Sequence, residues 1–516
     1  MKPLLDRLLD YYNLSNEEYL RITAPVSSET FAIGHKFDKV DEIVDFVSSF
    51  VKQNKKVIIY GDYDADGIMA TSIMMKMFSY VGFQADYYIP SRYLDGYGIN
   101  LEKSKEIVER GYDLVITVDN GISAFEAIDY LKAHGVSVVV FDHHEMQQSI
   151  PNCDYFMHPT LSNFGEIASS GAFVSFMFSI SFLGRYDKYL ATLASISLIS
   201  DMMPLKEYNR NLLRVVFASY KEGEFLPIDY LKENEPFNET TIGMKIAPKI
   251  NSIGRLLEDT SVNDIVRYFI CDDKDKLLNY LSWINDCNDE RKNLSKASNE
   301  NEFSVDENDP AIIYKTEEKE GLIGLIANYL CGKYHKPTIV FTVDSSGVAY
   351  KGSCRAPEGF NVVKSFESLS DLLITFGGHA LAGGCSLEMS KFEEFKQKFF
   401  EYVESHPIEK VEKESIPLYI RELTFENFEI IKSFSPFGEC MKSPLFILPR
   451  IKVGALLWSK DQKHILTQIG TNQKLIGFNF PKEEVTQHDY IDLIGTMREN
   501  SYRGFKNLEF FITEIK

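Results

Sequence analysis

Three short apolar runs in the first third of the chain are each followed at once by side chains that bind metal ions. The first run, residues 56–60, leads to Asp62, Asp64 and Asp66 at alternate positions. A run of β-branched and apolar residues predicts a buried strand, and the Met- and Ala-rich stretch after the acids predicts a helix. We therefore expect the three carboxylates at the carboxyl end of a strand, where open α/β sheets bind their ligands.

The other two apolar runs repeat this arrangement. The second, 114–118, leads to Asp119, and the third, 137–141, leads to an Asp-His-His sequence at 142–144. Carboxylates packed closely repel one another and need a cation, and a hard divalent ion such as Mg²⁺ or Mn²⁺ suits oxygen-rich ligand sets. One motif alone is equally typical of a solvated acidic turn or a helix N-cap, but three in succession favour a shared metal site.

At these residues the sequence resembles the DHH phosphoesterase superfamily. Asp142-His143-His144 is similar to the signature of that superfamily. Its other motifs are matched, in chain order, by residues 62–67, residues 119–121 and Asp201. Asp201 ends a nearly uncharged helical run, where a buried acid needs a partner; the alternative is an exposed acid at a helix end.

Within the superfamily, the sequence looks most like the RecJ-type single-strand exonucleases. Their Arg-x-x-x-Asp-Gly-Tyr-Gly loop is matched by residues 92–98 with one residue fewer, and their Pro-Arg-Ile-Asn-x-x-Gly-Arg segment by residues 248–255. Lys249 stands there in place of an arginine and is a poorer bidentate phosphate ligand. The resemblance implies substrate contacts for Arg92, Asn251 and Arg255. A surface position without a ligand is the alternative for Arg92.

Two Gly-rich elements further along resemble the DHH-associated C-terminal domain, which binds substrate opposite the metals. They are the Ser-x-Arg sequence at 353–355 and the Gly-Gly-His-x-x-Ala-Gly-Gly sequence at 377–384. The resemblance implies that Ser353, Arg355 and His379 bind substrate. Exposed amides in Gly-rich turns suit anions, although such turns are also common as purely structural features.

The fold class predicted for the chain is α/β, with a parallel-sheet DHH domain, a long helical connector, a second α/β (DHH-associated) domain and a C-terminal OB-like β-barrel. Five short barrel strands are expected, at 451–458, 464–469, 474–480, 491–497 and 508–515. The predicted boundaries are a helical preface at 1–36, the DHH domain at 37–260, the connector at 261–308, the DHH-associated domain at 309–406 and an OB-like nucleic-acid-binding domain at 407–516. Four residues of the last domain either stack on bases or fill the barrel: Trp458, Tyr502, Arg503 and Phe505.

The composition narrows the class of protein. The 516 residues carry a net charge of −20, which argues against a non-specific nucleic-acid coat because such binding depends on Lys and Arg. The seven cysteines form no Cys-x-x-Cys pair, so neither a zinc knuckle nor a disulfide framework is indicated, and free thiols suit a reducing cytosol. The most apolar stretch, 172–183, is shorter than the roughly 18 residues of a membrane span, and the N-terminus has no cleavable leader pattern. A cytoplasmic enzyme without a membrane partner is expected.

The mechanism that this implies is two-metal hydrolysis of a phosphodiester, with two Mn²⁺ or Mg²⁺ ions about 3.5–4 Å apart. The expected metal ligands are Asp64, Asp66, Asp119, His143 and Asp201, and Asp62 is either an additional ligand or an acid that supports the ligands from behind. His144 is expected to contact the scissile phosphate, and Asp142 to orient a histidine.

The activity implied by the resemblance is 5′-to-3′ hydrolysis of single-stranded DNA in repair and recombination. The polarity rests on the resemblance, as do a single-strand-binding protein and a helicase as partners of a monomer. One alternative is a DHH enzyme acting on short oligoribonucleotides, pAp, cyclic dinucleotides or pyrophosphate, and another is a non-catalytic scaffold. The extra C-terminal domain counts against the first, and the complete ligand set counts against the second.

Overall fold

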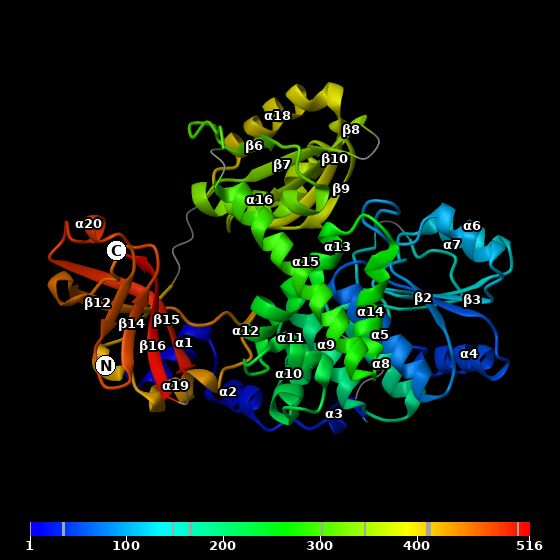
Figure 1. Cartoon of the computed structure of the whole chain (residues 1–516), viewed down its shortest axis with the longest axis horizontal. Helices are drawn as coiled ribbons and strands as arrows, with labels where there is room; N and C mark the ends of the chain where they lie inside the picture. The colour runs from blue at the N-terminus through cyan, green and yellow to red at the C-terminus, as the bar shows by residue number, and fades with distance from the viewer. Residues whose placement is uncertain are drawn as a thin grey trace. The chain divides into compact units, whose positions relative to one another are not determined.

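The structure, a computed structural model, describes residues 2–32, 37–146, 149–164, 168–300, 303–344, 347–408, 414–502 and 505–516. The chain forms two compact units (Figure 1). The larger unit contains residues 28–203 and 215–411, and the smaller contains residues 1–27, 204–214 and 412–516. Among the described residues, no helix combines the length and the apolar character that a membrane span requires.

The first half of the larger unit is built on a five-stranded sheet in the order β2-β1-β3-β4-β5, in which every pair is parallel. The strands are β1 Val57–Tyr60, β2 Asp86–Tyr88, β3 Leu114–Val118, β4 Ser137–Phe141 and β5 Tyr155–Met157. The predicted parallel sheet is confirmed. Side chains on both faces of β1 and β3 are buried, as expected for a sheet covered by helices on each side.

Helices cover both faces of this sheet (Figure 1). On one face, Ile58 and Val115 share a core with residues of α6 (Leu101–Glu109) and α7 (Phe125–Ala133). On the other face, α5 (Ala65–Tyr80) packs against β1 and β3. Helix α5 is buried almost all round because it also contacts α8 and α9, and this enclosure fixes the acidic segment at its N-terminus. The remaining helices of this half are α3 Glu29–Ala32, α4 Val40–Lys52, α8 Gly171–Leu183, α9 Lys188–Ser200, α11 Leu226–Lys232, α12 Glu239–Thr241, α13 Ala247–Leu256 and α14 Asp264–Ile270. Helix α10, Glu207–Ser219, has residues in both units.

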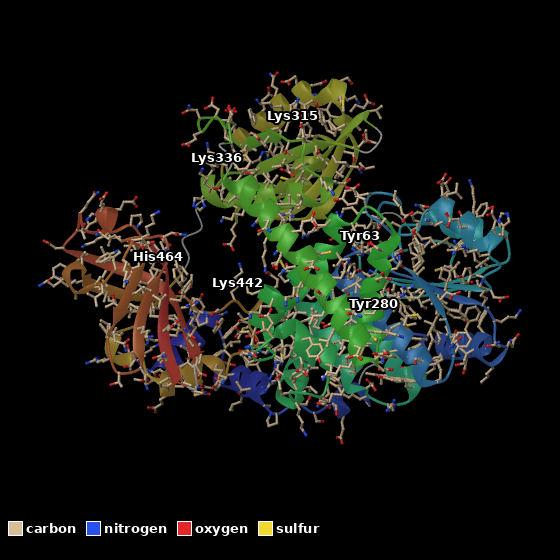
Figure 2. All side chains as sticks on the ribbon, in the orientation of Figure 1. Tyr63, Tyr280, Lys315, Lys336, Lys442 and His464 are labelled. Atoms are coloured by element: carbon tan, nitrogen blue, oxygen red, sulfur yellow. The ribbon has the colours of Figure 1, made fainter. Side chains whose placement is uncertain are left out.

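A 27-residue helix, α15 (Lys274–Glu300), leads to the second half of the larger unit. There the sheet order is β6-β7-β8-β10-β9, with β6 and β7 parallel and the other pairs antiparallel. The strands are β6 Ile312–Lys315, β7 Thr338–Val343, β8 Ala349–Arg355, β9 Leu373–His379 and β10 Ala382–Glu388, and the helices are α16 Glu320–Tyr334, α17 Val362–Glu367 and α18 Phe392–Ser405. Lys315, labelled in Figure 2, lies 3.5 Å from the ring centroid of Phe392 and helps to hold α18 on the sheet.

The smaller unit is a six-stranded mixed sheet in the order β11-β12-β15-β16-β14-β13. Its strands are β11 Ile416–Pro417, β12 Phe446–Lys452, β13 Ile465–Gln468, β14 Gln473–Gly477, β15 Tyr490–Tyr502 and β16 Phe505–Ile515, with helices α19 Phe425–Lys432 and α20 Lys482–Val485. The first helix of the chain, α1 (Leu4–Tyr12), contributes Leu4, Leu8 and Leu9 to the same core. The N-terminal helices α1 and α2 (Asn16–Thr23) therefore fold with the C-terminal residues.

The strand predicted at 451–458 is wrong. Strand β12 ends at Lys452 and is followed by a 3₁₀ turn at Val453–Ala455. Arg450 has a positive φ of 55°, and the register with β15 shifts between Leu448 and Ile451. Such a bulge interrupts regular pairing, which resumes at Ile451 and Lys452 before the strand ends, and it is invisible in the apolar pattern. Trp458 packs against the core and donates Nε1–H to the Phe480 carbonyl, while Arg503 and the side chains of Tyr502 and Phe505 lie outside the described residues.

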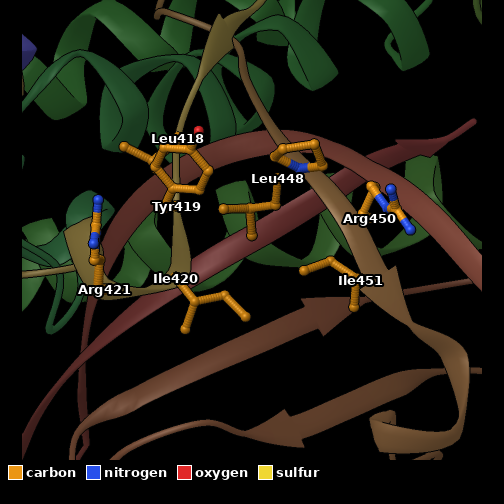
Figure 3. A pocket seen from close by; sticks show the side chains of 8 residues that line it. Leu418, Tyr419, Ile420, Arg421, Leu448, Arg450 and Ile451 are labelled. Atoms are coloured by element: carbon orange, nitrogen blue, oxygen red, sulfur yellow. The ribbon is translucent and has the colours of Figure 1, made fainter. Parts of the chain in front are cut away.

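A hollow of about 430 Å³ opens beside β11 and β12. Its floor is aliphatic and includes Leu418, Leu448 and Ile451, all of them buried. Figure 3 shows Arg421 and Arg450 on opposite sides of Leu448. Each arginine lies over a tyrosine ring, 5.4 Å from its centroid, so both cations of this hollow already have an aromatic contact.

Candidate metal centre and arginine cleft

The strand order brings the predicted metal ligands together. Strands β1, β3 and β4 are neighbours and parallel, so their carboxyl ends meet at one edge of the sheet. His143 Nε2 lies 3.1 Å from Asp119 Oδ1, 3.5 Å from Asp66 Oδ2 and 3.6 Å from Asp201 Oδ2. Asp62, Asp64 and Asp119 form a second group whose carboxylate oxygens lie within 4.8 Å of one another. We call these six side chains the acidic centre.

Three carboxylate oxygens of the acidic centre are buried without a hydrogen-bond partner among the described residues: Asp62 Oδ1, Asp119 Oδ1 and Asp201 Oδ2. Burial, together with the neighbouring aspartates, raises the pKa of Asp62 and Asp119 well above the usual range. The same causes raise the pKa of Asp201 to about 8. Buried carboxylates in this state need a cation. Aspartate oxygens with one imidazole are a donor set that Mn²⁺ or Mg²⁺ accepts, so the residues present fit a divalent metal centre.

Asp66 is fixed by the start of α8. Its Oδ2 accepts from the amide of Gly171 at 2.7 Å, and its Oδ1 accepts from the amide of Ala172 at 2.7 Å and from Ser197 Oγ at 2.6 Å. A helix N-terminus favours a negative charge. Gly171 is required here, because a Cβ at this position would lie 2.7 Å from Asp119 Cβ. Helix α8 can therefore press directly against the acidic centre.

Asp142 is saturated by donors. Its Oδ1 accepts from the amides of His143 and His144 and from His144 Nδ1, and its Oδ2 accepts from the amide of Ile122. Burial would raise the pKa of Asp142, but the hydrogen bond and positive charge of His144 outweigh it and lower the pKa far below the usual range. Burial would lower the pKa of His144, and Asp142 outweighs that effect and raises it to about 9. Tyr97 Oη lies 3.1 Å from His144 Nε2.

Two residues that hold this edge of the sheet in place went unrecognised in the sequence. Asn120, fully buried, donates to the carbonyls of Tyr60, Gly61 and Val118 and so ties β1 to β3. His158 donates Nε2–H to the His144 carbonyl. Both are single polar residues beside apolar strands. The only sequence signal for Asn120 was its place directly after Asp119.

A second group of predicted site residues forms what we call the arginine cleft: Arg92, Arg255 and Arg355. Arg92 stacks over the ring of Tyr63, labelled in Figure 2, at 4.2 Å from the centroid. The hydroxyl of Tyr93 donates to the Arg255 carbonyl at 2.5 Å and accepts from the amide of Gly321 at 3.3 Å. The loop after β2, the end of α13 and the start of α16 therefore meet at this cleft.

Ser353 and Arg355 come from β8. Arg355 Nη1 donates to Ser353 Oγ at 3.2 Å and to the Cys354 carbonyl at 2.7 Å. A Cβ at Gly324 on α16 would lie 3.1 Å from both Ser353 Oγ and Arg355 Nη2. Glycine at this position keeps the space beside these polar atoms open. The backbone of His379 ends β9, and its side chain lies outside the described residues.

In the segment 248–255, the side chains of Asn251 and Lys249 make structural hydrogen bonds within the protein. These contacts differ from the substrate contact that the resemblance implies for this segment. The side-chain oxygen of Asn251 accepts from the amide of Ala65 at 2.8 Å, so it holds the first turn of α5 beside the acidic segment. Lys249 is buried and donates to the Leu231 carbonyl at 3.1 Å and to Glu233 Oε1 at 2.8 Å. Its ammonium group ends α11 and is not available to a phosphate.

Comparison with known proteins agrees with this architecture. Residues 56–199 match the model of the DHH family, N-terminal domain, residues 308–405 match the DHHA1 domain, and residues 416–514 match the RecJ OB domain. The chain belongs to the DHH superfamily and is of the RecJ type. The suspected resemblance is thereby confirmed, as is the fold class.

Relatives align with this RecJ-type chain along nearly its whole length. The single-stranded-DNA-specific exonuclease RecJ of Bacillus subtilis is 27% identical, covering 99% of this chain and 68% of the relative. The protein of the same name in Haemophilus influenzae is 25% identical, covering 100% and 96%. The crystal structure of RecJ in complex with Mn²⁺ from Thermus thermophilus superposes with a TM-score of 0.85 at 22% identity, covering 100% of this chain and 76% of that one.

Proposed function

We propose that this chain is a metal-dependent exonuclease that hydrolyses the phosphodiester bonds of single-stranded DNA from the 5′ end, in DNA repair and recombination. The observation that carries the proposal is the acidic centre, with three buried carboxylate oxygens that have no partner among the described residues, in the same compact unit as the arginine cleft. Acids that need cations and arginines that need anions suit a phosphodiester bound between them. The names of the relatives and the match to a RecJ OB domain support single-stranded DNA as the substrate.

The ions would be held by Asp62, Asp64, Asp66, Asp119, His143 and Asp201, whose oxygens and ring nitrogen converge in the acidic centre. When bound, divalent ions supply Lewis acidity and a water that ionises near neutral pH. Burial lowers the pKa of His143, so its imidazole is neutral at pH 7 and suited to ligation.

His144 would contact the scissile phosphate. Asp142 fixes its ring through Nδ1 at 2.8 Å, and in the metal-free site Asp142 and the neighbouring aspartates outweigh burial and raise the pKa of His144 to about 9. A cationic imidazole can donate to a phosphate oxygen. In this role Asp142 acts only through His144, because all its described contacts are to the backbone and to that ring.

The arginine cleft would hold the phosphates of the strand end, with Ser353 beside it, and a substrate contact of His379 rests on the family resemblance. The side chain of Asn251 is directed at α5, so it would take part by fixing the acidic segment. The 5′-to-3′ polarity rests on the family resemblance. So do a single-strand-binding protein and a helicase as partners of a monomer. The proposed cytoplasmic location rests on the seven cysteines, which form no Cys-x-x-Cys pair.

The experiment incubates the purified chain with Mn²⁺ and single-stranded DNA labelled at either the 5′ or the 3′ end, with a duplex control. Early release of mononucleotide from the 5′ label alone, with the duplex spared, is the expected result. Release from the 3′ label first would reverse the polarity. Long DNA left intact while short RNA, pAp or a cyclic dinucleotide is hydrolysed would replace this proposal with a small-substrate phosphodiesterase.

A further inference from the structure

A fourth arginine, Arg291, lies on the connector helix α15, near enough to Arg255 for its charge to help lower the pKa of that group. Arg291 is half-buried, and its Nε is fully buried without a hydrogen-bond partner in the part of the chain that the structure describes. A hydrogen bond runs from its Nη2 to Oδ1 of Asn288, one turn earlier on the same helix, at 3.1 Å. A half-buried guanidinium group whose buried Nε–H has no described acceptor is an incomplete site.

The packing of α15 sets the helix that carries Arg291 against two helices that border the arginine cleft. Helix α15 contacts α13, whose last turn carries Arg255, and also α16. The start of α16 meets Arg255, since a Cβ at Gly321 would lie 2.1 Å from the Arg255 carbonyl oxygen. Arg355 lies beside the same helix, at Gly324. The four arginines thus come from the loop after β2, from α13, from α15 and from β8.

The four arginines share one property, which is that none of them forms an ion pair within the described part of the chain. Their side-chain hydrogen bonds go to neutral oxygens, those of Gly254, Asn288, Ser353 and Cys354. Burial, together with the charges of Arg92, Arg355 and Arg291, lowers the pKa of Arg255 to about 10. Like charges gathered out of water destabilise the folded state until an anion joins them.

We propose that Arg291 is a fourth phosphate-binding residue, so that the connector helix itself contacts the substrate and the four arginines hold two successive phosphates of one strand. The proposal rests on the proposed function, which supplies a single-stranded polyanion. A terminal phosphate ester carries a charge of about −1.5 to −2, and the next phosphodiester adds one more negative charge. Two phosphates therefore offset most of the positive charge, whereas one leaves about half of it.

A purely structural role for Arg291 makes the opposite prediction about stability. If Arg291 served to hold α15, replacing it would lower the melting temperature of the free protein. If it belongs to an uncompensated cationic site, Arg291→Gln removes repulsion, and the melting temperature of the free protein stays level or rises. The same substitution then reduces the stabilisation that a phosphate ligand confers.

The first measurement is binding of a 5′-phosphorylated single-stranded oligonucleotide in EDTA, followed by fluorescence anisotropy at several salt concentrations. The matched control is Lys292→Gln, which removes the next charge on α15, an exposed one paired with Asp289 at 2.9 Å. Arg291→Gln should weaken binding roughly tenfold or more and reduce the slope of log affinity against log salt by about one. Arg291→Lys should fall between Arg291→Gln and the parent chain, and Lys292→Gln should bind as the parent chain does.

The second measurement is the melting temperature with and without inorganic pyrophosphate, again in EDTA. A smaller pyrophosphate shift for Arg291→Gln than for the parent chain and Lys292→Gln supports the site, even if the parent chain does not hydrolyse DNA and the proposed function fails. Equal shifts and equal oligonucleotide affinities for all three proteins would overturn it, as would a lower melting temperature of free Arg291→Gln with unchanged affinity. Hydrolysis of DNA by the parent chain with Mn²⁺ tests the proposed function separately.

Discussion

The acidic centre and the arginine cleft lie in one compact unit. Each gathers like charges in a buried place, negative charges in the acidic centre and positive charges in the arginine cleft. In the acidic centre, carboxylates converge until burial and mutual repulsion raise the pKa of Asp62 and Asp119. In the cleft, arginines converge until burial and repulsion lower the pKa of Arg255 to about 10. The two groups could have neutralised each other as salt bridges. The scaffold instead holds them apart, which leaves each free for a ligand of the opposite charge.

Rigid secondary-structure elements hold the acidic centre and the arginine cleft apart. The acids sit at parallel strand ends that Asn120 ties together, and the arginines are carried on α13, on β8 and on a loop fixed by Tyr93. Arg92 belongs to the arginine cleft but also interacts with the acidic centre. Burial alone would lower the pKa of Arg92, and Tyr63, Asp62 and Asp64 are among the groups that raise it. If the two groups are separate ligand sites, substitutions should affect them separately.

The largest expected effect is that of Asp119→Asn. Asp119 has a positive φ of 62°, a conformation that asparagine adopts readily, so the variant changes charge with little change in the backbone. Hydrolysis should fall at least about 100-fold. The metal-free melting temperature should rise, because repulsion is relieved, and the rise on adding Mn²⁺ should shrink.

Asp129→Asn, on the exposed side of α7, is the matched control and should behave as the parent chain. Oligonucleotide binding in EDTA should be undiminished in Asp119→Asn. A full Mn²⁺ response together with near-normal hydrolysis in Asp119→Asn would remove Asp119 from the ligand set.

Arg255→Gln should produce the complementary pattern. Its Mn²⁺-induced rise in melting temperature should match that of the parent chain, while affinity for single-stranded DNA falls roughly 10- to 100-fold. Arg267→Gln, which removes an exposed arginine paired with Asp264 at 2.7 Å, is the control. A lost Mn²⁺ response in Arg255→Gln would show that the cleft and the acidic centre form a single unit, contrary to the comparison.

The stability of the metal-free protein should depend on pH, and this dependence tests the acidic centre by itself. Carboxyl groups whose folded pKa is raised, including Asp201 at about 8, keep protons that the unfolded chain releases near pH 4. His144, at about 9, keeps a proton that the unfolded chain releases near pH 6.5. Both effects favour the folded state at low pH and are lost as pH rises.

In EDTA, the melting temperature should therefore be several degrees higher at pH 6 than at pH 8.5, and scanning calorimetry at the two values measures this. Saturating Mn²⁺ should reverse the trend, because a cation favours the ionised carboxylates. A melting temperature in EDTA that rises with pH would contradict the burial of unpaired carboxylates in the acidic centre.

The sequence predicts the acidic centre better than it predicts what surrounds it. Five of its six ligands follow three largely apolar strands, so local pattern and parallel topology suffice to bring these five together, whereas Asp201 follows the end of α9. The roles assigned to Arg291 and His158 depend on packing against residues that are distant in sequence, so no local pattern reveals them. The core shared by α1 and the C-terminal strands has the same character, and no local pattern marks it. Likewise, no local pattern marks the positive φ of Arg450 or the register shift beside it near the end of β12.

Replacing Asn251 should have the smallest effect of these substitutions, and it tests a single hydrogen bond beside the acidic centre. Its side-chain oxygen accepts from the amide of Ala65, so Asn251→Ala should cost about 1 kcal/mol of unfolding free energy. It should also weaken the Mn²⁺ response several-fold by loosening the acidic segment, and leave DNA binding in EDTA unchanged. Asn251→Asp keeps the acceptor and adds a negative charge beside Asp64 and Asp66, so it should lower metal-free stability yet retain the Mn²⁺ response. Reduced DNA binding with a normal Mn²⁺ response in Asn251→Ala would return Asn251 to the arginine cleft, as the family resemblance implies.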